Sequence, residues 1–335
     1  MSRIVLVTAT KLAPEATALL TEAGLTPVFT EAYPDEASLL ALIRQHRPCA
    51  ILHRQGLINT TVMDAAAPEL LVVARHGAGL DGVDLAAARQ RNLTVVRAAG
   101  ANAPAVAEHS MALLLALLKD LPGITAGMRD GKWEKTTRVT RDLQGMVLGI
   151  VGYGAIGGRV AKLASAFGAE ILVYDPYLRA DVLPGLGERC ATLPSMLARC
   201  EALSMHCPLN AETRGMIGAA ELALMPQGAL LINAARGGVV DEAALLAALE
   251  TGQIAAAGID VFETEPLQAE SELRRHPHVI ATPHVAASSR LGSVAMATGA
   301  ADGIVSALAR RVPKLPGAVT VPGSLLEGIA QASVA

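Results

Sequence analysis

Short apolar runs rich in β-branched residues alternate with amphipathic segments along most of the chain. The runs have the length and composition of buried parallel strands, and the amphipathic segments have helical spacing. The predicted strands are Ile4–Val7, Pro27–Thr30, Ala50–Leu52, Leu70–Ala74, Thr94–Val96, Val147–Val151, Glu170–Tyr174, Ala202–His206, Ala229–Asn233, Ala256–Asp260 and Val279–Ala281. The predicted helices are Pro14–Ala23, Asp35–His46, Thr60–Ala66, Pro104–Lys119, Arg159–Phe167, Thr192–Arg199, Ala219–Leu224, Asp241–Thr251 and Arg290–Leu308. This alternation predicts an α/β fold in which helices cover parallel sheets.

The alternation extends over enough of the chain for two domains, each with its own core. With 335 residues, the chain exceeds the usual size of one domain. Residues 1–100 complete one set of strands and helices before the long helix predicted at Pro104–Lys119, which leads into a second set. The helix predicted at Arg290–Leu308 is free to return to the first set. We therefore expect two Rossmann-like or flavodoxin-like domains with parallel sheets and an interdomain cleft.

A glycine-rich loop directly follows the strand predicted at Val147–Val151. It consists of Gly152, Tyr153, Gly154, Ala155, Ile156 and Gly157, which gives the spacing G-x-G-x-x-G. In dinucleotide-binding folds the first glycine permits a tight turn, the second admits the pyrophosphate, and the third allows close packing of helix on strand. The helix that follows offers unpaired N–H groups to the phosphates. A purely structural turn is the alternative, because the chain contains 31 glycines.

An acidic residue follows the next strand at the spacing that a dinucleotide site requires. Asp175 ends the strand predicted at Glu170–Tyr174, about 20 residues after the last glycine of the loop. Its carboxylate can accept hydrogen bonds from a ribose diol, and its charge would repel a 2′-phosphate. The combination of strand, glycine loop, helix, second strand and acid predicts NAD as the cofactor, in preference to NADP.

Composition narrows the classes of partner. Hydrophobic residues make up 52% of the chain but aromatic residues only 2%, so Ala, Leu and Val must fill the cores. A formal net charge of −3 gives no basic surface for nucleic acid. The longest uncharged apolar run, Met111–Leu118, is too short to span a bilayer, so we expect no membrane partner. Cys49, Cys190, Cys200 and Cys207 form no C-x-x-C pair, which predicts small core residues, a cytoplasmic location and no bound metal.

Three side chains suited to proton transfer and carboxylate binding follow strands of the second set. Arg236, Glu265 and His284 each lie in a glycine- or proline-rich loop at the carboxyl end of a predicted strand. Arginine can bind a carboxylate through two N–H groups, histidine can take a hydroxyl proton, and a neighbouring carboxylate can orient the imidazole. Hydride transfer between NAD and a 2-hydroxy acid requires such a set. Each residue alone could be exposed or part of a turn, but three on strand ends of one nucleotide-binding sheet predict a catalytic site.

Several segments of the sequence resemble the D-isomer-specific 2-hydroxyacid dehydrogenase family. They are VGYGAIG with YDP downstream, HCPLNAETRGMIG, LINAARGGVVDEAALLAALETGQIAAAGIDVFETEPL and TPHVA, and the similarity covers nearly the whole chain. The resemblance implies that Arg236 orients the substrate and that Glu265 and His284 form the pair that handles the proton. It also implies a discontinuous substrate domain, residues 1–100 plus 287–335, and an NAD-binding Rossmann domain, residues 101–286.

The same resemblance implies further contacts to cofactor and substrate. The implied cofactor contacts, besides the glycine loop, are Asp175, Cys207, Pro208, Thr213, Ala234, Ala235, Arg236, Asp260, His284 and Ala287. The segment ARHGAGLDGVD at 74–84 matches the family's substrate loop, whose N–H groups could bind a carboxylate; a simple turn is the alternative. The substrate contacts expected on this basis are Arg54, Arg75, His76, Ala78, Gly79, Arg236 and His284.

The identity of the 2-hydroxy acid stays open at this point. Arg54 and Arg75, with DGKWE at 130–134, resemble phosphoglycerate dehydrogenases, in which basic residues meet a phosphate. This favours 3-phosphoglycerate as the substrate and 3-phosphohydroxypyruvate as the product, although Arg54 could instead be a surface charge. Hydroxypyruvate, glyoxylate and a sulfonated 2-hydroxy acid are the alternatives. Because the sequence ends at residue 335, we expect no regulatory domain of the kind that many phosphoglycerate dehydrogenases carry.

Two functions other than 2-hydroxy acid oxidation are possible alternatives. An NAD-sensing co-regulator is the alternative from a different class of protein, although no partner-binding motif supports it. Formate or phosphite oxidation on the same fold is a further alternative, and Glu265 argues against formate oxidation, in which no proton must be taken.

The resemblance implies a homodimer, and the apolar face of the helix at Pro104–Lys119 could contact a second copy or be buried within one chain.

Overall fold

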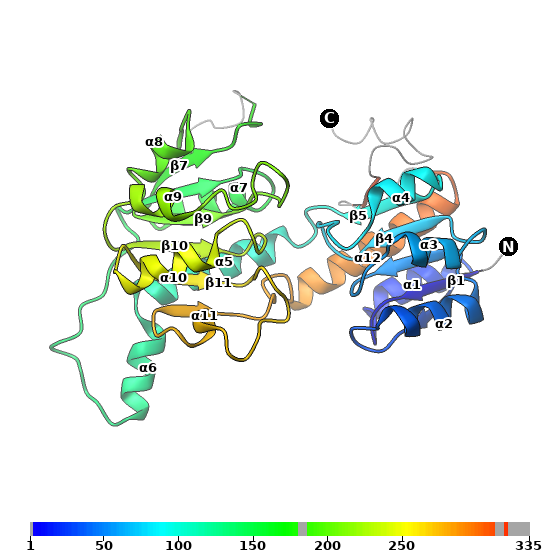
Figure 1. Ribbon diagram of the computed structural model, residues 1–335, viewed down its shortest axis with the longest axis horizontal. Coiled ribbons are helices and arrows are strands. Elements are labelled where there is room, and N and C mark those ends of the chain that lie inside the picture. The colour runs from blue at the N-terminus through cyan, green and yellow to red at the C-terminus, as the bar shows by residue number, and fades with distance from the viewer. Residues whose placement is uncertain (1–2, 180–185, 312–317, 321–335) are drawn as a thin grey trace. The chain divides into compact units, whose positions relative to one another are not determined.

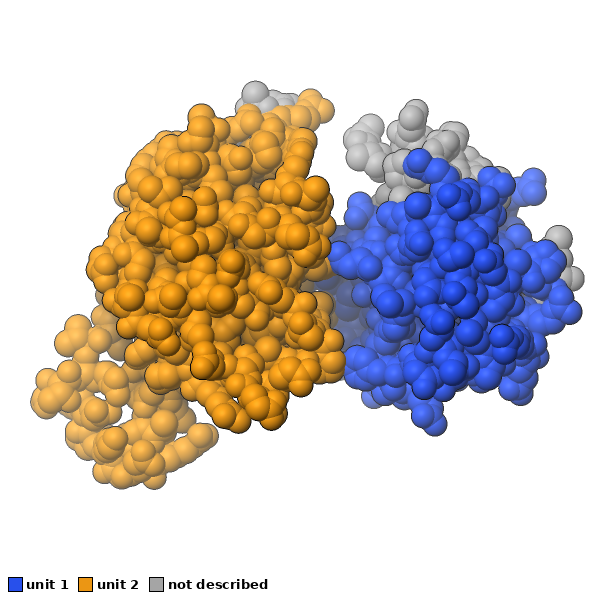
Figure 2. All heavy atoms as spheres, in the orientation of Figure 1, with its two compact units in different colours: residues 1–102, 289–335 blue, residues 103–288 orange. Residues whose placement is uncertain are grey.

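The computed structural model describes residues 3–179, 186–311 and 318–320. The chain divides into two compact units (Figure 2). Unit 1 comprises Met1–Asn102 and Ser289–Ala335, and unit 2 comprises Ala103–Ser288. Sequence analysis places the divisions between its domains after residues 100 and 286, and part of its C-terminal segment 287–335 lies outside the described residues.

Unit 1 is built on a six-stranded sheet with helices on both faces (Figure 1). Its elements are β1 (Ile4–Val7), α1 (Pro14–Glu22), β2 (Thr26–Phe29), α2 (Glu36–His46), β3 (Ala50–His53), α3 (Thr60–Ala65), β4 (Val72–Arg75), α4 (Leu85–Gln90), β5 (Thr94–Ala98), α12 (Arg290–Leu308) and β13 (Ala318–Thr320). The strand order is β13-β5-β4-β3-β1-β2. Strands β1 to β5 are parallel, and β13 pairs antiparallel with β5.

Unit 2 is built on a seven-stranded sheet that is parallel throughout. Its elements are α5 (Ala103–Leu118), α6 (Leu121–Arg129), β6 (Val147–Val151), α7 (Gly157–Ala166), β7 (Glu170–Tyr174), β8 (Glu188–Arg189), α8 (Leu193–Leu197), β9 (Ala202–Met205), α9 (Ala219–Leu224), β10 (Ala229–Asn233), α10 (Glu242–Glu250), β11 (Ile254–Ile259), α11 (Glu272–Arg275) and β12 (Val279–Ala281). The strand order is β12-β11-β10-β9-β6-β7-β8. The prediction of an α/β fold with parallel sheets is confirmed.

Every predicted helix and strand is present, with its ends within two residues of the predicted positions. The hydrophobic pattern misses α4, α6, α11, β8 and β13, most of which are short. Two of the missed helices carry a capping signal instead. The Asp84 side chain accepts a hydrogen bond from the N–H of Ala87 at the start of α4, and Asp120 accepts one from Gly123 at the start of α6.

The cores on both faces of each sheet are aliphatic, as the low aromatic content predicts. In β1, Val5 and Val7 pack into a cluster with α1 and α12, whereas Leu6 packs into a second cluster with α2 and α3. This division follows from the alternation of side chains across a strand. All eight Phe, Tyr and Trp residues are described, and of these only Phe262 is buried.

The apolar face of α5 is buried within unit 2. Val106, Met111, Leu113 and Leu114 are all buried, and the helix contacts α7, β10 and β11. This corrects the expectation that the face is available to a second copy, and the alternative of burial within one chain holds. The reason is that α5 lies directly on the sheet of its own unit, where its Leu and Met side chains fill the core.

Helix α12 is long and apolar enough to cross a membrane on length and hydropathy alone, but 56% of it is buried within the structure. It packs against α1 and against strands β3, β4 and β5. Helices α5 and α6 together pass the same test, as a pair bent by 59°. The packing of α12 in unit 1 accounts for its apolar composition, since helices that are buried on most sides are apolar on most sides.

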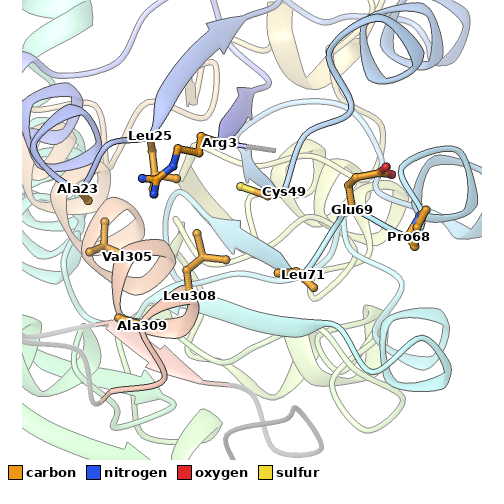
Figure 3. A pocket seen from close by; sticks show the side chains of 10 residues that line it. All are labelled: Arg3, Ala23, Leu25, Cys49, Pro68, Glu69, Leu71, Val305, Leu308 and Ala309. Atoms are coloured by element: carbon orange, nitrogen blue, oxygen red, sulfur yellow. The ribbon is translucent and has the colours of Figure 1, made fainter. Parts of the chain in front are cut away.

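Unit 1 contains a cavity of about 640 Å³ at the amino ends of its strands (Figure 3). Its walls are mostly aliphatic, with Arg3, Cys49 and Glu69 as the polar members. Burial raises the pKa of the Cys49 thiol. The predicted substrate loop follows β4 at the carboxyl ends of the strands, where ligands of parallel α/β sheets bind. The cavity therefore lies at the opposite edge of the sheet from this loop.

Candidate active site

Apart from Asp175, which follows β7, the predicted cofactor and catalytic residues of unit 2 lie after five neighbouring strands. Strands β12, β11, β10, β9 and β6 are consecutive and parallel, so the loops after them share one edge of the sheet. From β6 the chain proceeds in one direction to β7 and β8, and in the other direction to β9 and the remaining strands. This reversal is the topological switch point at which open α/β sheets bind ligands.

The glycine loop has the geometry that a dinucleotide requires. A Cβ on Gly157 would lie 2.0 Å from the carbonyl oxygen of Gly152, and one on Gly152 would lie 2.8 Å from the N atom of Cys207. Among the described residues other than Gly154 and its two chain neighbours, no heavy atom lies within 4 Å of the position of a Cβ on Gly154, which leaves room for a phosphate. Among the described residues no side chain caps the start of α7, so the partial positive charge of this helix end is left for an anion. The residues present therefore fit the pyrophosphate of NAD.

Asp175 connects the glycine loop to the strand β7. Its Oδ2 accepts a hydrogen bond from the N–H of Tyr153 at 2.8 Å, and its Oδ1 accepts one from the N–H of Tyr177 at 2.9 Å. A carboxylate oxygen can accept more than one hydrogen bond, so both oxygens can also accept from a ribose diol. The contact of Asp175 to a ribose diol stays a prediction.

Other predicted cofactor residues surround the glycine loop. Ile156, Ala234, Ala286 and Ala287 pack together with Val106 of α5. This small cluster brings the loops after β6, β10 and β12 into contact.

The predicted residues Cys207, Pro208 and Thr213 form one turn after β9. The Thr213 hydroxyl donates to the carbonyl oxygen of Pro208 at 2.6 Å. The Cys207 thiol is buried, and burial raises its pKa to about 11. Cys207 therefore presents a neutral thiol beside Gly152, which suits a packing contact and not a nucleophile.

His284 and Glu265 form a hydrogen-bonded pair. The distance from His284 Nδ1 to Glu265 Oε2 is 2.7 Å, and Glu265 Oε1 accepts a hydrogen bond from the N–H of Phe262 at 3.0 Å. Burial acts to raise the pKa of Glu265, but the two hydrogen bonds and the charges of His284 and Arg236 outweigh it and lower the pKa. The carboxylate thus stays ionised at neutral pH and fixes the imidazole, whose Nε2 remains for another partner.

Arg236 lies in a loop that packs closely against the Glu265 loop. Its Nη1 donates to the carbonyl oxygen of Ala235 at 2.6 Å, and Asn233 Nδ2 donates to the carbonyl oxygen of Arg236 at 3.0 Å. A Cβ on the next residue, Gly237, would lie 1.8 Å from the carbonyl oxygen of Phe262. Only glycine fits there, and this close approach brings the guanidinium near enough to lower the pKa of Glu265. The structure therefore brings Arg236, Glu265 and His284 together.

Asp260 organises the loop that carries His284. Its side chain is fully buried, and its oxygens accept hydrogen bonds from the Thr282 hydroxyl and from the N–H groups of Val285 and Ala286. Its backbone carbonyl accepts from the N–H of His284 at 2.8 Å. The cofactor contact implied for Asp260 stays a prediction, and its visible contacts are those of a residue that positions the loop.

The predicted substrate residues of unit 1 lie at the carboxyl ends of β3 and β4. The Arg75 guanidinium donates to the carbonyl oxygens of His53, Arg54 and Gly79 at 2.7–3.2 Å, so it stabilises the loop that contains Ala78 and Gly79. The Arg54 backbone N–H donates to Thr8 Oγ1, and in the part of the chain that the structure describes no hydrogen bond or ion pair is found for its guanidinium. Arg54 is therefore better placed than Arg75 to bind an anion.

His76 is buried rather than exposed in this loop. Burial, together with the charges of Arg54 and Arg75, lowers the pKa of His76 to about 4. The ring is therefore neutral near pH 7 and cannot supply a positive charge to a substrate. The backbone N–H of His76 donates to the carbonyl oxygen of His53 at 2.9 Å, and the contact between His76 and substrate stays a prediction.

Four residues with a part in these sites escape sequence reasoning. Arg97 donates to the carbonyl oxygen of Ala78, Gly237 permits the approach of two loops, and His109 and Thr282 bind each other beside Asp260. Thr282 lies in the TPHVA segment two residues before His284, and Gly237 directly follows Arg236 in NAARGG. Their positions next to predicted catalytic residues could have indicated a part in the site. His109 and Arg97 carry no such signal, because they come from elements distant in sequence.

Comparison with known proteins places the chain in a family. Residues 111–286 match the family model described as "D-isomer specific 2-hydroxyacid dehydrogenase, NAD binding domain". The chain belongs to the D-isomer specific 2-hydroxyacid dehydrogenase family. The resemblance stated from the sequence motifs is thereby confirmed, and so is the prediction of an NAD-binding domain.

The relatives of this dehydrogenase include proteins named for different substrates. The chain is 39% identical to D-3-phosphoglycerate dehydrogenase of Mycobacterium tuberculosis over 97% of its own length and 60% of the relative's. It is 35% identical to that of Archaeoglobus fulgidus, over 81% of its own length and 51% of the relative's. The crystal structure of a glyoxylate/hydroxypyruvate reductase from Sinorhizobium meliloti, in complex with NADP and malonate, has a TM-score of 0.83 at 31% identity, over 96% of this chain and 98% of the other. The chain thus spans just over half the length of these two curated relatives.

Proposed function

We propose that this protein interconverts a small D-2-hydroxy acid and its 2-oxo acid with NAD. The observation that carries the proposal is the 2.7 Å hydrogen bond between His284 and Glu265, in a loop cluster that also contains Arg236. An oriented histidine beside an ionised carboxylate is suited to take a hydroxyl proton. The cluster lies on the edge of the sheet that carries the NAD-binding glycine loop.

The roles of the residues follow from their donors and acceptors. The glycine loop and the first turn of α7 bind the pyrophosphate, and Asp175 accepts hydrogen bonds from the ribose diol. NAD, when bound, would supply the acceptor for the hydride that leaves C2 of the hydroxy acid. Arg236 binds the substrate carboxylate, and His284 Nε2 takes the proton of the C2 hydroxyl. Glu265 stabilises the imidazolium that forms, and the reverse direction returns the proton to the C2 oxygen.

For the substrate we infer a choice between two classes. The similarity to curated 3-phosphoglycerate dehydrogenases and the guanidinium of Arg54 favour a substrate that carries a phosphate besides its carboxylate, such as 3-phosphoglycerate. The similarity to the glyoxylate/hydroxypyruvate reductase, and the engagement of Arg75 by backbone carbonyls, favour a smaller monoanion. Of the two, we propose the phosphorylated substrate, with Arg54 as the group that binds its phosphate.

The test is a steady-state assay of the oxidation of 3-phosphoglycerate and glycerate with NAD or NADP, and of the reduction of glyoxylate with NADH or NADPH, on the wild type and on Arg54→Gln. We expect turnover with NAD in preference to NADP, because the charge of Asp175 repels a 2′-phosphate. We expect Arg54→Gln to raise KM for 3-phosphoglycerate roughly tenfold or more and to leave KM for glyoxylate unchanged.

Arg47→Gln is the matched control, because Arg47 precedes β3, at the opposite end of the strand from Arg54, and forms an ion pair with Glu69. Equal effects of Arg54→Gln on both substrates, or activity with glyoxylate alone, would contradict the assignment of a phosphorylated substrate. Absence of turnover with every 2-hydroxy and 2-oxo acid would contradict the proposed reaction itself.

We also propose that two copies of the chain associate through α6 and the segment after it. This part of unit 2 extends away from its sheet (Figure 1) and exposes Leu121, Met128, Trp133 and Val139, with 77% of Trp133 and 91% of Val139 accessible. Exposed apolar side chains gathered on one projecting segment are typical of an interaction surface. With α5 buried, this is the apolar surface of unit 2 best suited to a second copy.

Sedimentation of the wild type is expected to give a dimer, and the double variant Trp133→Glu, Val139→Glu a monomer with unchanged thermal stability of each unit. Trp133 is the single tryptophan of the chain, so its fluorescence should shift to shorter wavelength as the dimer forms. A wild type that sediments as a monomer at all concentrations would contradict this assembly.

A further inference from the structure

A chain of hydrogen bonds connects helix α5 to the loop that carries His284. The distance from His109 Nε2, on α5, to Thr282 Oγ1 is 3.1 Å, and the Thr282 hydroxyl donates to Asp260 Oδ1 at 2.5 Å. Asp260 accepts in turn from the N–H groups of the two residues that follow His284, each at 2.9 Å. The chain therefore reaches from α5 to both sides of His284 in the sequence.

The direction of these hydrogen bonds fixes the hydrogen on His109. A threonine hydroxyl has one hydrogen, and in Thr282 it points to a carboxylate, which can only accept. The Thr282 oxygen must therefore accept from His109, so Nε2 of His109 carries a hydrogen. His109 Nε2 also lies 3.7 Å from Asp260 Oδ1. Because Asp260 is fully buried, each donor in the chain limits how its carboxylate can turn.

We propose that His109 is a positioning residue for His284, an inference that rests on the proposed function. His284 has φ +52°, a left-handed conformation that is unfavourable for a residue other than glycine and persists only where its surroundings hold it. Asp260 supplies this restraint through its carbonyl and both carboxylate oxygens. His109 and Thr282 fix the carboxylate of Asp260, and the imidazole of His284 consequently stays in hydrogen-bond contact with Glu265.

The kinetic test uses variants that separate the hydrogen bond from the volume of the side chain. His109→Leu removes the donor, whereas His109→Gln keeps an N–H donor near the same position. We expect His109→Leu to lower kcat roughly ten- to a hundredfold, as small displacements of catalytic groups do, with little change in the affinity for NAD. His109→Gln should recover most of the loss. Glu108→Gln, an exposed neighbour on α5, is the matched control and should keep wild-type kcat.

Thr282 provides a second route to the same test. Thr282→Val should reproduce the loss of kcat, and Thr282→Ser should restore it. The double variant His109→Leu, Thr282→Val should lose no more than the more impaired single variant, because both substitutions break one chain. Additive losses in the double variant would contradict the coupling.

A readout that needs no turnover keeps this proposal separate from the proposed function. The nitrogen-15 signals of the His284 imidazole report its tautomer and its bond to Glu265, and they should move in His109→Leu and not in Glu108→Gln. If they move while the wild type oxidises no 2-hydroxy acid, the positioning role is supported and the proposed function alone is contradicted. If His109→Leu leaves kcat and the His284 signals at wild-type values, or if His109→Leu and His109→Gln are equally impaired, the proposal is overturned.

Discussion

His284→Asn is expected to lower kcat for oxidation of the hydroxy acid by roughly a hundred- to ten-thousandfold, the usual contribution of an oriented general base. The imidazole is the group paired with Glu265, and asparagine cannot take the proton from the C2 hydroxyl. Asparagine adopts left-handed backbone conformations more readily than most residues, so the φ of +52° should be kept. The rate of NADH formation measures the loss.

The control for this substitution separates catalysis from binding and folding. NAD affinity, measured by calorimetry, should stay near the wild-type value, because the glycine loop and Asp175 are unchanged. His278→Asn, at an exposed histidine that precedes β12, should retain wild-type kcat. Near-normal turnover by His284→Asn would remove His284 from the proton transfer.

Gly237→Ala is expected to disrupt both the site and the stability of unit 2. The added Cβ would lie 1.8 Å from the carbonyl oxygen and 2.1 Å from the carbonyl carbon of Phe262, so one of the two loops must shift. Overpacking of this kind costs up to about 3 kcal/mol, which corresponds to a fall in Tm of roughly 6–12 °C for a unit of this size. Displacement of Arg236 and Glu265 should lower kcat/KM by about a hundredfold as well.

Gly158→Ala tests whether the effect belongs to the site or to the loss of any glycine. Gly158 lies within helix α7, where the nearest atom to an added Cβ is 3.8 Å away, on the Tyr153 ring. Alanine favours the helix by up to about 1 kcal/mol, so stability should be unchanged or higher. Scanning calorimetry of both variants measures the difference, and equal Tm values for Gly237→Ala and the wild type would contradict the packing argument.

The fold could be predicted largely from local patterns, because buried parallel strands and amphipathic helices leave clear periodic signals. Strands such as β6 and β10 have the predicted ends, since apolar runs without charges fit only a sheet covered on both faces. The misses have local causes. Helix α4 is short, and α6 contains a proline and two glycines, which are not typical of a helix. Both helices begin at a capping aspartate, Asp84 and Asp120.

The parts of the candidate site that directly follow a strand could be predicted from the sequence. The glycine loop, Asp175 and the residues Arg236, Glu265 and His284 all follow strands, and parallel topology brings such loops to one edge. Contacts between elements distant in sequence could not be predicted in this way. The use of Arg75 to bind carbonyl oxygens of its own unit, and the approach of His109 to Thr282, depend on side-chain packing that no local pattern encodes.

The central claim is that His284 takes the proton from the hydroxyl of a substrate bound through Arg236. The most direct measurement is the structure of the protein with NAD and a non-reactive 2-hydroxy acid analogue. The account predicts His284 Nε2 about 3 Å from the C2 oxygen, and the analogue's carboxylate bound by the Arg236 guanidinium. A carboxylate bound away from Arg236, with the C2 oxygen out of reach of His284, would contradict it.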